Sequence, residues 1–226
     1  MKKIRNQKGV SLIELIAGIP IATLLFATLI LAMVHFVKTY QETKLFLQLQ
    51  EDLYQTIEYM RYGHAHETET EGEQLIGLMT ARDVQLSAAG NYLQIFPLMT
   101  NQTYAGSFWT RYTVNDDHQM EVRSRYGNSK TVETMLIFPR MKFHENQQNE
   151  RPKKFGNEPQ FEIMNPRDIW TVHVDDGGNA MMVDIRLEGK VRYRERQDGQ
   201  STREDIAKNT RTIVYETSVF LGNAVH

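Results

Sequence analysis

The longest apolar stretch of the sequence lies near its start and contains one acidic residue. Residues 10–37 are mostly apolar, and their single carboxylate belongs to Glu14. A helix needs about 20 apolar residues to cross the hydrocarbon core of a bilayer, so this stretch predicts a membrane-spanning helix. A carboxylate in hydrocarbon costs about 2.5–3.5 kcal/mol on insertion scales. The pattern therefore indicates that Glu14 has a function and a partner.

After residue 37 the apolar residues recur every three or four positions. This stripe consists of Phe46, Leu49, Leu53, Ile57 and Met60. The spacing is typical of an amphipathic helix with one apolar face, and we expect it over residues 38–62. Gly63 is a suitable residue to end it. One continuous helix from about residue 12 to residue 61 would be about 75 Å long.

Residues 63–226 have the alternating pattern of a β-rich domain. Strands are expected over residues 75–79, 84–86, 92–98, 108–114, 119–126, 132–138, 169–174, 181–194 and 212–222. Turn-forming residues at 115–118 and 175–179 predict two hairpins. Residues 140–168 are rich in proline and polar residues and predict a long loop, which either contacts a partner or is a surface excursion. The predicted fold class is α+β, with a long N-terminal helix packed on a mainly antiparallel β-sheet head.

The residues before the apolar stretch are basic. Lys2, Lys3, Arg5 and Lys8 occur among the first nine residues, with no acid. Positive charge beside a membrane helix predicts that this end lies in the cytoplasm. A secretory signal peptide has an apolar region of only about 7–15 residues followed by a cleavage site with small residues, which this sequence lacks.

Residues 8–15, Lys-Gly-Val-Ser-Leu-Ile-Glu-Leu, resemble the class III signal of type IV pilins and pseudopilins. In that family a prepilin peptidase cleaves after the glycine, methylates the new N-terminal residue and leaves an acid at mature position five. The resemblance implies a leader of residues 1–9, cleavage between Gly9 and Val10, methylation of Val10, and an assembly role for Glu14. Phenylalanine is commoner than valine at the first mature position, which weakens the case for a major pilin more than the case for processing.

The same resemblance supplies a partner for the buried acid. After cleavage, the Glu14 carboxylate can pair with the α-amino group of Val10 in a neighbouring subunit, which offsets two desolvation costs. Pro20 removes one helical hydrogen bond and kinks or opens the preceding turn. In filaments of this family the same helix segment unwinds locally during assembly. Pro20 either contributes to that unwinding or is a tolerated kink in a membrane helix.

The C-terminal residues 215–223, Tyr-Glu-Thr-Ser-Val-Phe-Leu-Gly-Asn, resemble the last strand of J-type minor pseudopilins of type II secretion and of PilW-like minor pilins. The two resemblances imply a non-enzymatic minor subunit that initiates or caps a filament in a type IV pilus, type II secretion or competence system. They imply as partners the prepilin peptidase, other pilins or pseudopilins, the inner-membrane assembly platform and the bilayer. The subunit would lie in the inner membrane, N-terminus in the cytoplasm and head outside, before entering an extracytoplasmic filament.

A basic strip on one predicted strand offers a second function. Lys190, Arg192 and Arg194 fall on one face, beside Tyr193, and could contact the phosphates of DNA in a competence pseudopilin. The alternative is a solvated strip paired with nearby acids. The formal net charge is −2, and it would be about −6 without residues 1–9, which favours the alternative.

No metal, cofactor or catalytic set is expected. The two histidines and alternating glutamates of residues 64–74 are read as a solvated acidic loop rather than a metal site. The acidic turn at residues 175–179 lacks a downstream bidentate glutamate, so a turn is favoured over a calcium site. The absence of cysteine removes thiol nucleophiles and disulfides. An extracytoplasmic enzyme held by an uncleaved anchor is the alternative hypothesis.

Overall fold

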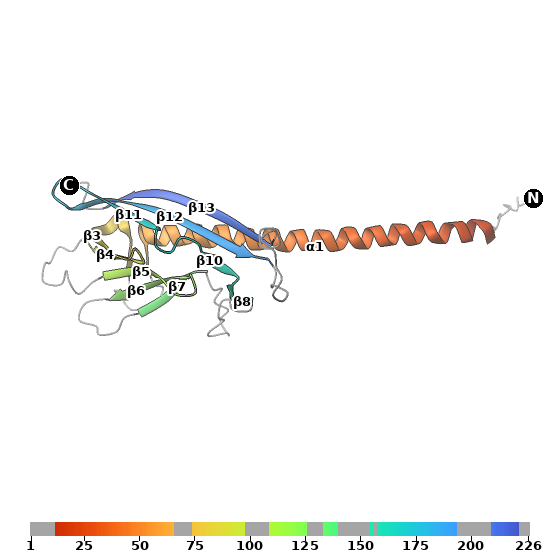
Figure 1. Cartoon of the computed structure of the whole chain (residues 1–226), viewed down its shortest axis with the longest axis horizontal. Coiled ribbons are helices and arrows are strands. Elements are labelled where there is room, and N and C mark those ends of the chain that lie inside the picture. The colour runs from red at the N-terminus through yellow and green to blue at the C-terminus, as the bar shows by residue number, and fades with distance from the viewer. Residues whose placement is uncertain are drawn as a thin grey trace, which may run out of the picture. The chain divides into compact units, whose positions relative to one another are not determined.

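The computed structural model describes residues 12–65, 74–97, 109–125, 133–139, 154–155, 158–193 and 209–221. The chain forms two compact units, residues 1–44 and residues 45–226. The long helix α1 (Leu12–Tyr62) has 51 residues, and the other main elements are strands (Figure 1). The predicted α+β class and the predicted helix are confirmed. The expected leader of residues 1–9, with Gly9, and Val10 lie outside the described residues.

The described part of the first unit is the apolar portion of α1. Every side chain from residue 12 to residue 41 is exposed, including those of many leucine and isoleucine residues. By length and composition this helix could cross a membrane. Pro20 lies inside it.

In the second unit, four of the five residues of the predicted apolar stripe of α1 are buried, and Phe46 is partly buried. Leu49, Leu53 and Met60 have no exposed surface, and Ile57 is 5% exposed. Gly63 has a φ angle of 74°, a left-handed conformation that glycine adopts without strain. The helix therefore ends where the sequence predicts.

A five-stranded antiparallel sheet has the order β3-β4-β5-β6-β7. Its strands are β3 (Ala81–Leu86), β4 (Tyr92–Pro97), β5 (Trp109–Val114), β6 (Met120–Arg125) and β7 (Glu133–Phe138). The predicted β5–β6 hairpin is confirmed, and the Asn115 side-chain oxygen accepts the Gln119 N–H at 2.9 Å. The Tyr112 hydroxyl donates to the Tyr59 carbonyl at 2.9 Å and so joins this sheet to α1.

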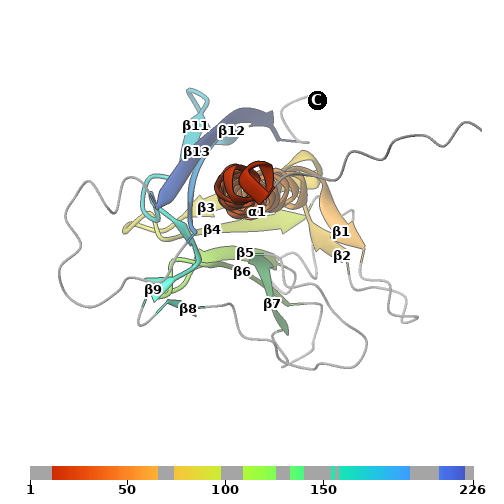
Figure 2. The same cartoon turned by 90° about the vertical axis from the view of Figure 1, so that its right-hand side faces the viewer.

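A second antiparallel sheet is built around β12 (Ala180–Arg192). Strand β13 (Thr210–Phe220) pairs with one edge of β12 from Met182 to Arg192. Strands β11 (Trp170–Val174) and β10 (Phe161–Ile163) both pair with the other edge of β12. The predicted hairpin and the inward face of Val183, Ile185 and Leu187 are confirmed. Residues 45–62 of α1 lie between this sheet and the five-stranded sheet (Figure 2).

Two predictions of local structure were wrong. Residues 140–168 are not one uninterrupted loop, because they contain β8 (Lys154–Phe155), β9 (Glu158–Pro159) and β10, which the surrounding prolines and polar residues mask in the sequence. Instead of a strand over residues 75–79, β2 (Gln74–Ile76) pairs with β1 (Gly63–Ala65) and a 3-10 turn, η1 (Leu78–Thr80), follows. Gly77 separates the two elements, and a Cβ atom there would lie 2.2 Å from the Gly63 nitrogen.

Candidate functional site

The first candidate site is the start of α1, where Glu14 lies in the first turn. Its neighbours Ile13 and Leu15 are 78% and 56% exposed, so the acid lies in an apolar surface. An exposed apolar surface of this extent is typical of membrane-interaction or protein-interaction sites. A carboxylate at a helix N-terminus also interacts favourably with the positive end of the helix dipole.

The second candidate site is the predicted basic strip, and the structure places an acid in it. Lys190 and Glu162 are register partners on β12 and β10, and the Lys190 ammonium forms an ion pair with the Glu162 carboxylate. The Arg192 guanidinium lies 3.8 Å from the same carboxylate. The side chains of Lys190, Arg192 and Glu162 are only 14%, 15% and 11% exposed. Arg194 lies outside the described residues.

The ion pairs with Glu162 make Lys190 and Arg192 less available to an anionic ligand. A phosphate that approached Lys190 or Arg192 would compete with a carboxylate that already interacts with both cations. The sequence does not indicate this acid, because Glu162 belongs to β10, in a segment whose composition predicts a loop. DNA contact at Lys190, Arg192 and Arg194 remains a prediction.

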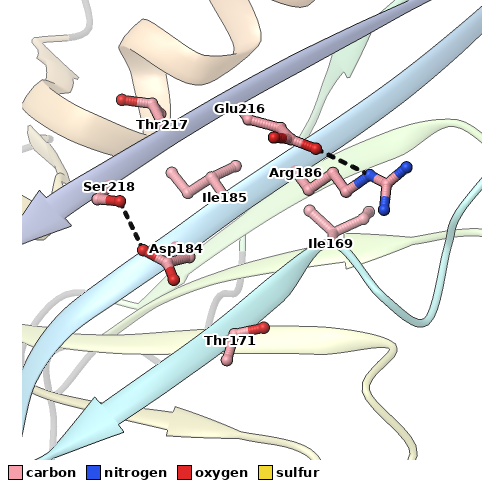
Figure 3. A pocket seen from close by; sticks show the side chains of 8 residues that line it. All are labelled: Ile169, Thr171, Asp184, Ile185, Arg186, Glu216, Thr217 and Ser218. Carbon is pink, nitrogen blue, oxygen red and sulfur yellow. Dashed lines mark hydrogen bonds and ion pairs between the residues drawn. The ribbon is translucent and has the colours of Figure 1, made fainter.

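The third candidate is a shallow pocket of about 400 Å³ on the β11–β12–β13 sheet (Figure 3). Asp184 and Ser218 point toward one another from β12 and β13, and the hydroxyl donates to the carboxylate at 2.6 Å. The His173 ring nitrogen Nε2 lies 2.6 Å from the other Asp184 oxygen. The Ser218 hydrogen bond, followed by the hydrogen bond to His173, lowers the pKa of Asp184 below its usual value. Arg186 and Glu216 form an ion pair at 3.2 Å beside them.

These groups have the residue types of a catalytic triad but not its arrangement. A serine nucleophile needs an imidazole bonded to its hydroxyl, with the carboxylate behind the imidazole. Here the carboxylate lies between the hydroxyl and the imidazole. The cluster therefore joins three neighbouring strands rather than activating Ser218.

The acidic turn between β11 and β12 is held by its own side chains. The Asp175 carboxylate accepts the Asn179 backbone N–H at 2.8 Å and the Asn179 side-chain amide at 3.1 Å. These hydrogen bonds lower the pKa of Asp175, and the bond from the Asn179 side-chain amide has the largest effect. The predicted turn is confirmed, with Gly178 at a φ angle of 82°. Among the described residues, no group of three or more acidic or histidine side chains could hold a metal ion.

Comparison with protein-family models, curated proteins and solved structures gave no match.

Proposed function

We propose that the chain is a minor subunit of a type IV filament machine, a minor pilin or pseudopilin. The observation that carries this proposal is Glu14, the one carboxylate among residues 12–41 of α1, a segment in which every side chain is exposed and most are apolar. A carboxylate is costly to place in lipid, and the α-amino group that cleavage after Gly9 would create on another copy is a cation that can pair with it. The class III signal at residues 8–15 supports the same cleavage.

The two parts of α1 then have different tasks. The apolar part holds the subunit in the inner membrane, with its N-terminus in the cytoplasm, and later packs against the helices of other pilins in a filament. The apolar face of the amphipathic part, from Leu49 to Met60, is buried in the β-rich head. The head would lie outside the membrane. The head contacts neighbouring subunits, and the subunit initiates or caps a pilus, type II secretion or competence filament. The prepilin peptidase and the assembly platform are its other partners.

Glu14 allows a direct test of assembly. The variant Glu14→Gln removes the charge while it preserves the size of the side chain, so we expect cleavage to continue and incorporation into sheared filaments to fall. We expect incorporation to fall at least tenfold, which corresponds to a loss of about 1.4 kcal/mol in the free energy of assembly. Glu51→Gln, which changes an exposed acid of the same helix, is the matched control. Normal incorporation of Glu14→Gln would contradict the pairing.

A further inference from the structure

One face of the five-stranded sheet combines arginines with aromatic rings. We define the arginine face as the side chains of Tyr92, Gln94, Trp109, Arg111, Glu121, Arg123 and Arg125, which alternate with the buried side chains of β4, β5 and β6. Glu121 is the only acidic residue in these three strands, whereas Arg111 and Arg123 lie directly opposite one another on this face. This face therefore carries positive charge in a chain whose net charge is negative.

Arg111 is stacked between two aromatic rings. Its guanidinium carbon lies 4.5 Å from the centre of the Tyr92 ring and 5.0 Å from that of the Trp109 ring. The guanidinium Nε also donates to the Gln94 side-chain oxygen at 3.0 Å, which fixes its orientation. The result is a row of planar groups across β4 and β5. Aromatic rings and guanidinium planes are the surfaces on which the bases of single-stranded nucleic acids stack.

A second cation lies directly opposite this stack. Arg123 on β6 is the register partner of Arg111 on β5. Like charges at directly opposite positions destabilise an antiparallel pair, so a bound anion would stabilise this arrangement. Glu121 offsets part of the charge, at 3.4 Å from Arg123, but the Arg123 side chain is still 48% exposed. A phosphate can therefore reach it.

We propose that the arginine face binds single-stranded nucleic acid, with bases stacked on Trp109 and Tyr92 and the phosphate backbone contacting Arg123. The positive charge favours an anionic ligand, and the row of planar groups favours a ligand with flat rings. A single-stranded nucleic acid has both properties. This site is distinct from the strip at Lys190, Arg192 and Arg194, whose first two cations lie against Glu162. It does not depend on filament assembly.

The two tryptophans make the site directly measurable. Trp170 is buried, 3% exposed, whereas Trp109 is half-buried on the arginine face. Titration of the full-length protein in detergent micelles with a thymidine oligonucleotide of about 12 nucleotides should therefore quench the fluorescence of Trp109. Anisotropy of a labelled oligonucleotide should show that Trp109→Leu weakens binding about tenfold, within the range found for loss of one stacking ring. Far-ultraviolet circular dichroism and the urea midpoint establish that each variant is folded.

The variant Arg123→Gln tests whether the oligonucleotide binds at the arginine face or is attracted nonspecifically by the charge of the protein. Loss of one phosphate contact to a single strand should reduce the slope of log affinity against log salt by about 0.7. Arg211→Gln, at an exposed arginine of the second sheet, is the matched control and should leave the slope unchanged. Equal slopes for Arg123→Gln and the wild-type protein would overturn the proposal. Binding of polygalacturonate but not of the oligonucleotide would also overturn it, since that ligand is an anion without flat rings.

Discussion

A Cβ atom on Gly189 of β12 would lie 2.6 Å from the Cδ1 atom of Leu53 in α1. The strand and the helix therefore approach one another as closely as a residue without a side chain allows. Leu53 is completely buried, so its side chain has little room to move away.

We expect Gly189→Ala to lower the free energy of unfolding by about 1–3 kcal/mol, the usual effect of overpacking a core. Leu53→Ala alone should cost about 2–5 kcal/mol because it leaves a cavity. In the double variant the new methyl group occupies part of that cavity. The loss of unfolding free energy in the double variant should therefore be smaller than the sum of the losses in the two single variants. Urea unfolding of the full-length protein in detergent measures all three variants, and strict additivity would contradict the close packing.

The ion pairs of the second sheet should differ in their contribution to stability. Glu162 is nearly buried with Lys190 and Arg192, whereas the Arg186 and Glu216 side chains are 58% and 67% exposed. Glu162→Gln removes the carboxylate that lies against two mostly buried cations and should cost about 3 kcal/mol, the lower end of the range for breaking a buried ion pair. Glu216→Gln should cost about 0–1 kcal/mol. Equal urea midpoints for the two variants would show that Glu162 does not stabilise the strip.

Asp184 should make stability depend on acid pH. Its pKa is lower in the folded protein than the ordinary value of 3.8, mainly because the Ser218 hydroxyl donates to it. A carboxyl with a lowered pKa stabilises the fold above pH 3.8, and this contribution is lost as the pH falls through the lowered pKa. We expect Ser218→Ala to raise the pKa of Asp184 toward its ordinary value. Titration of the carboxyl carbon by NMR measures this, and an unchanged midpoint would contradict the role of Ser218.

Much of the fold follows from patterns that lie within a few residues of one another. The apolar run, the helical stripe from Leu49 to Met60, and Gly63 predict α1 to within one residue at its C-terminal end. The two hairpins can also be predicted from local sequence, because the turn residues at 115–118 and 175–179 lie beside the strands that they join. The inward face of Val183, Ile185 and Leu187 follows from simple alternation.

The pairings between distant strands could not be predicted in this way. Strand β10 has only three residues and lies in a segment rich in proline, so its pairing with β12 depends on tertiary packing. The position of Glu162 opposite Lys190 follows from that pairing. Similarly, Arg111 and Arg123 share a register only after β5 and β6 have paired, and the cation stack with Tyr92 requires β4 as well. The arginine face is therefore a property of the sheet and not of any one strand.

The proposed function is tested most directly by the mass of the mature N-terminus. We expect the full-length chain, produced in membranes with an active prepilin peptidase, to begin at a methylated Val10. A bulky replacement such as Gly9→Leu should block that cleavage. An intact, unmodified N-terminus with residues 1–9 still attached would contradict the proposal and favour an enzyme held by an uncleaved anchor.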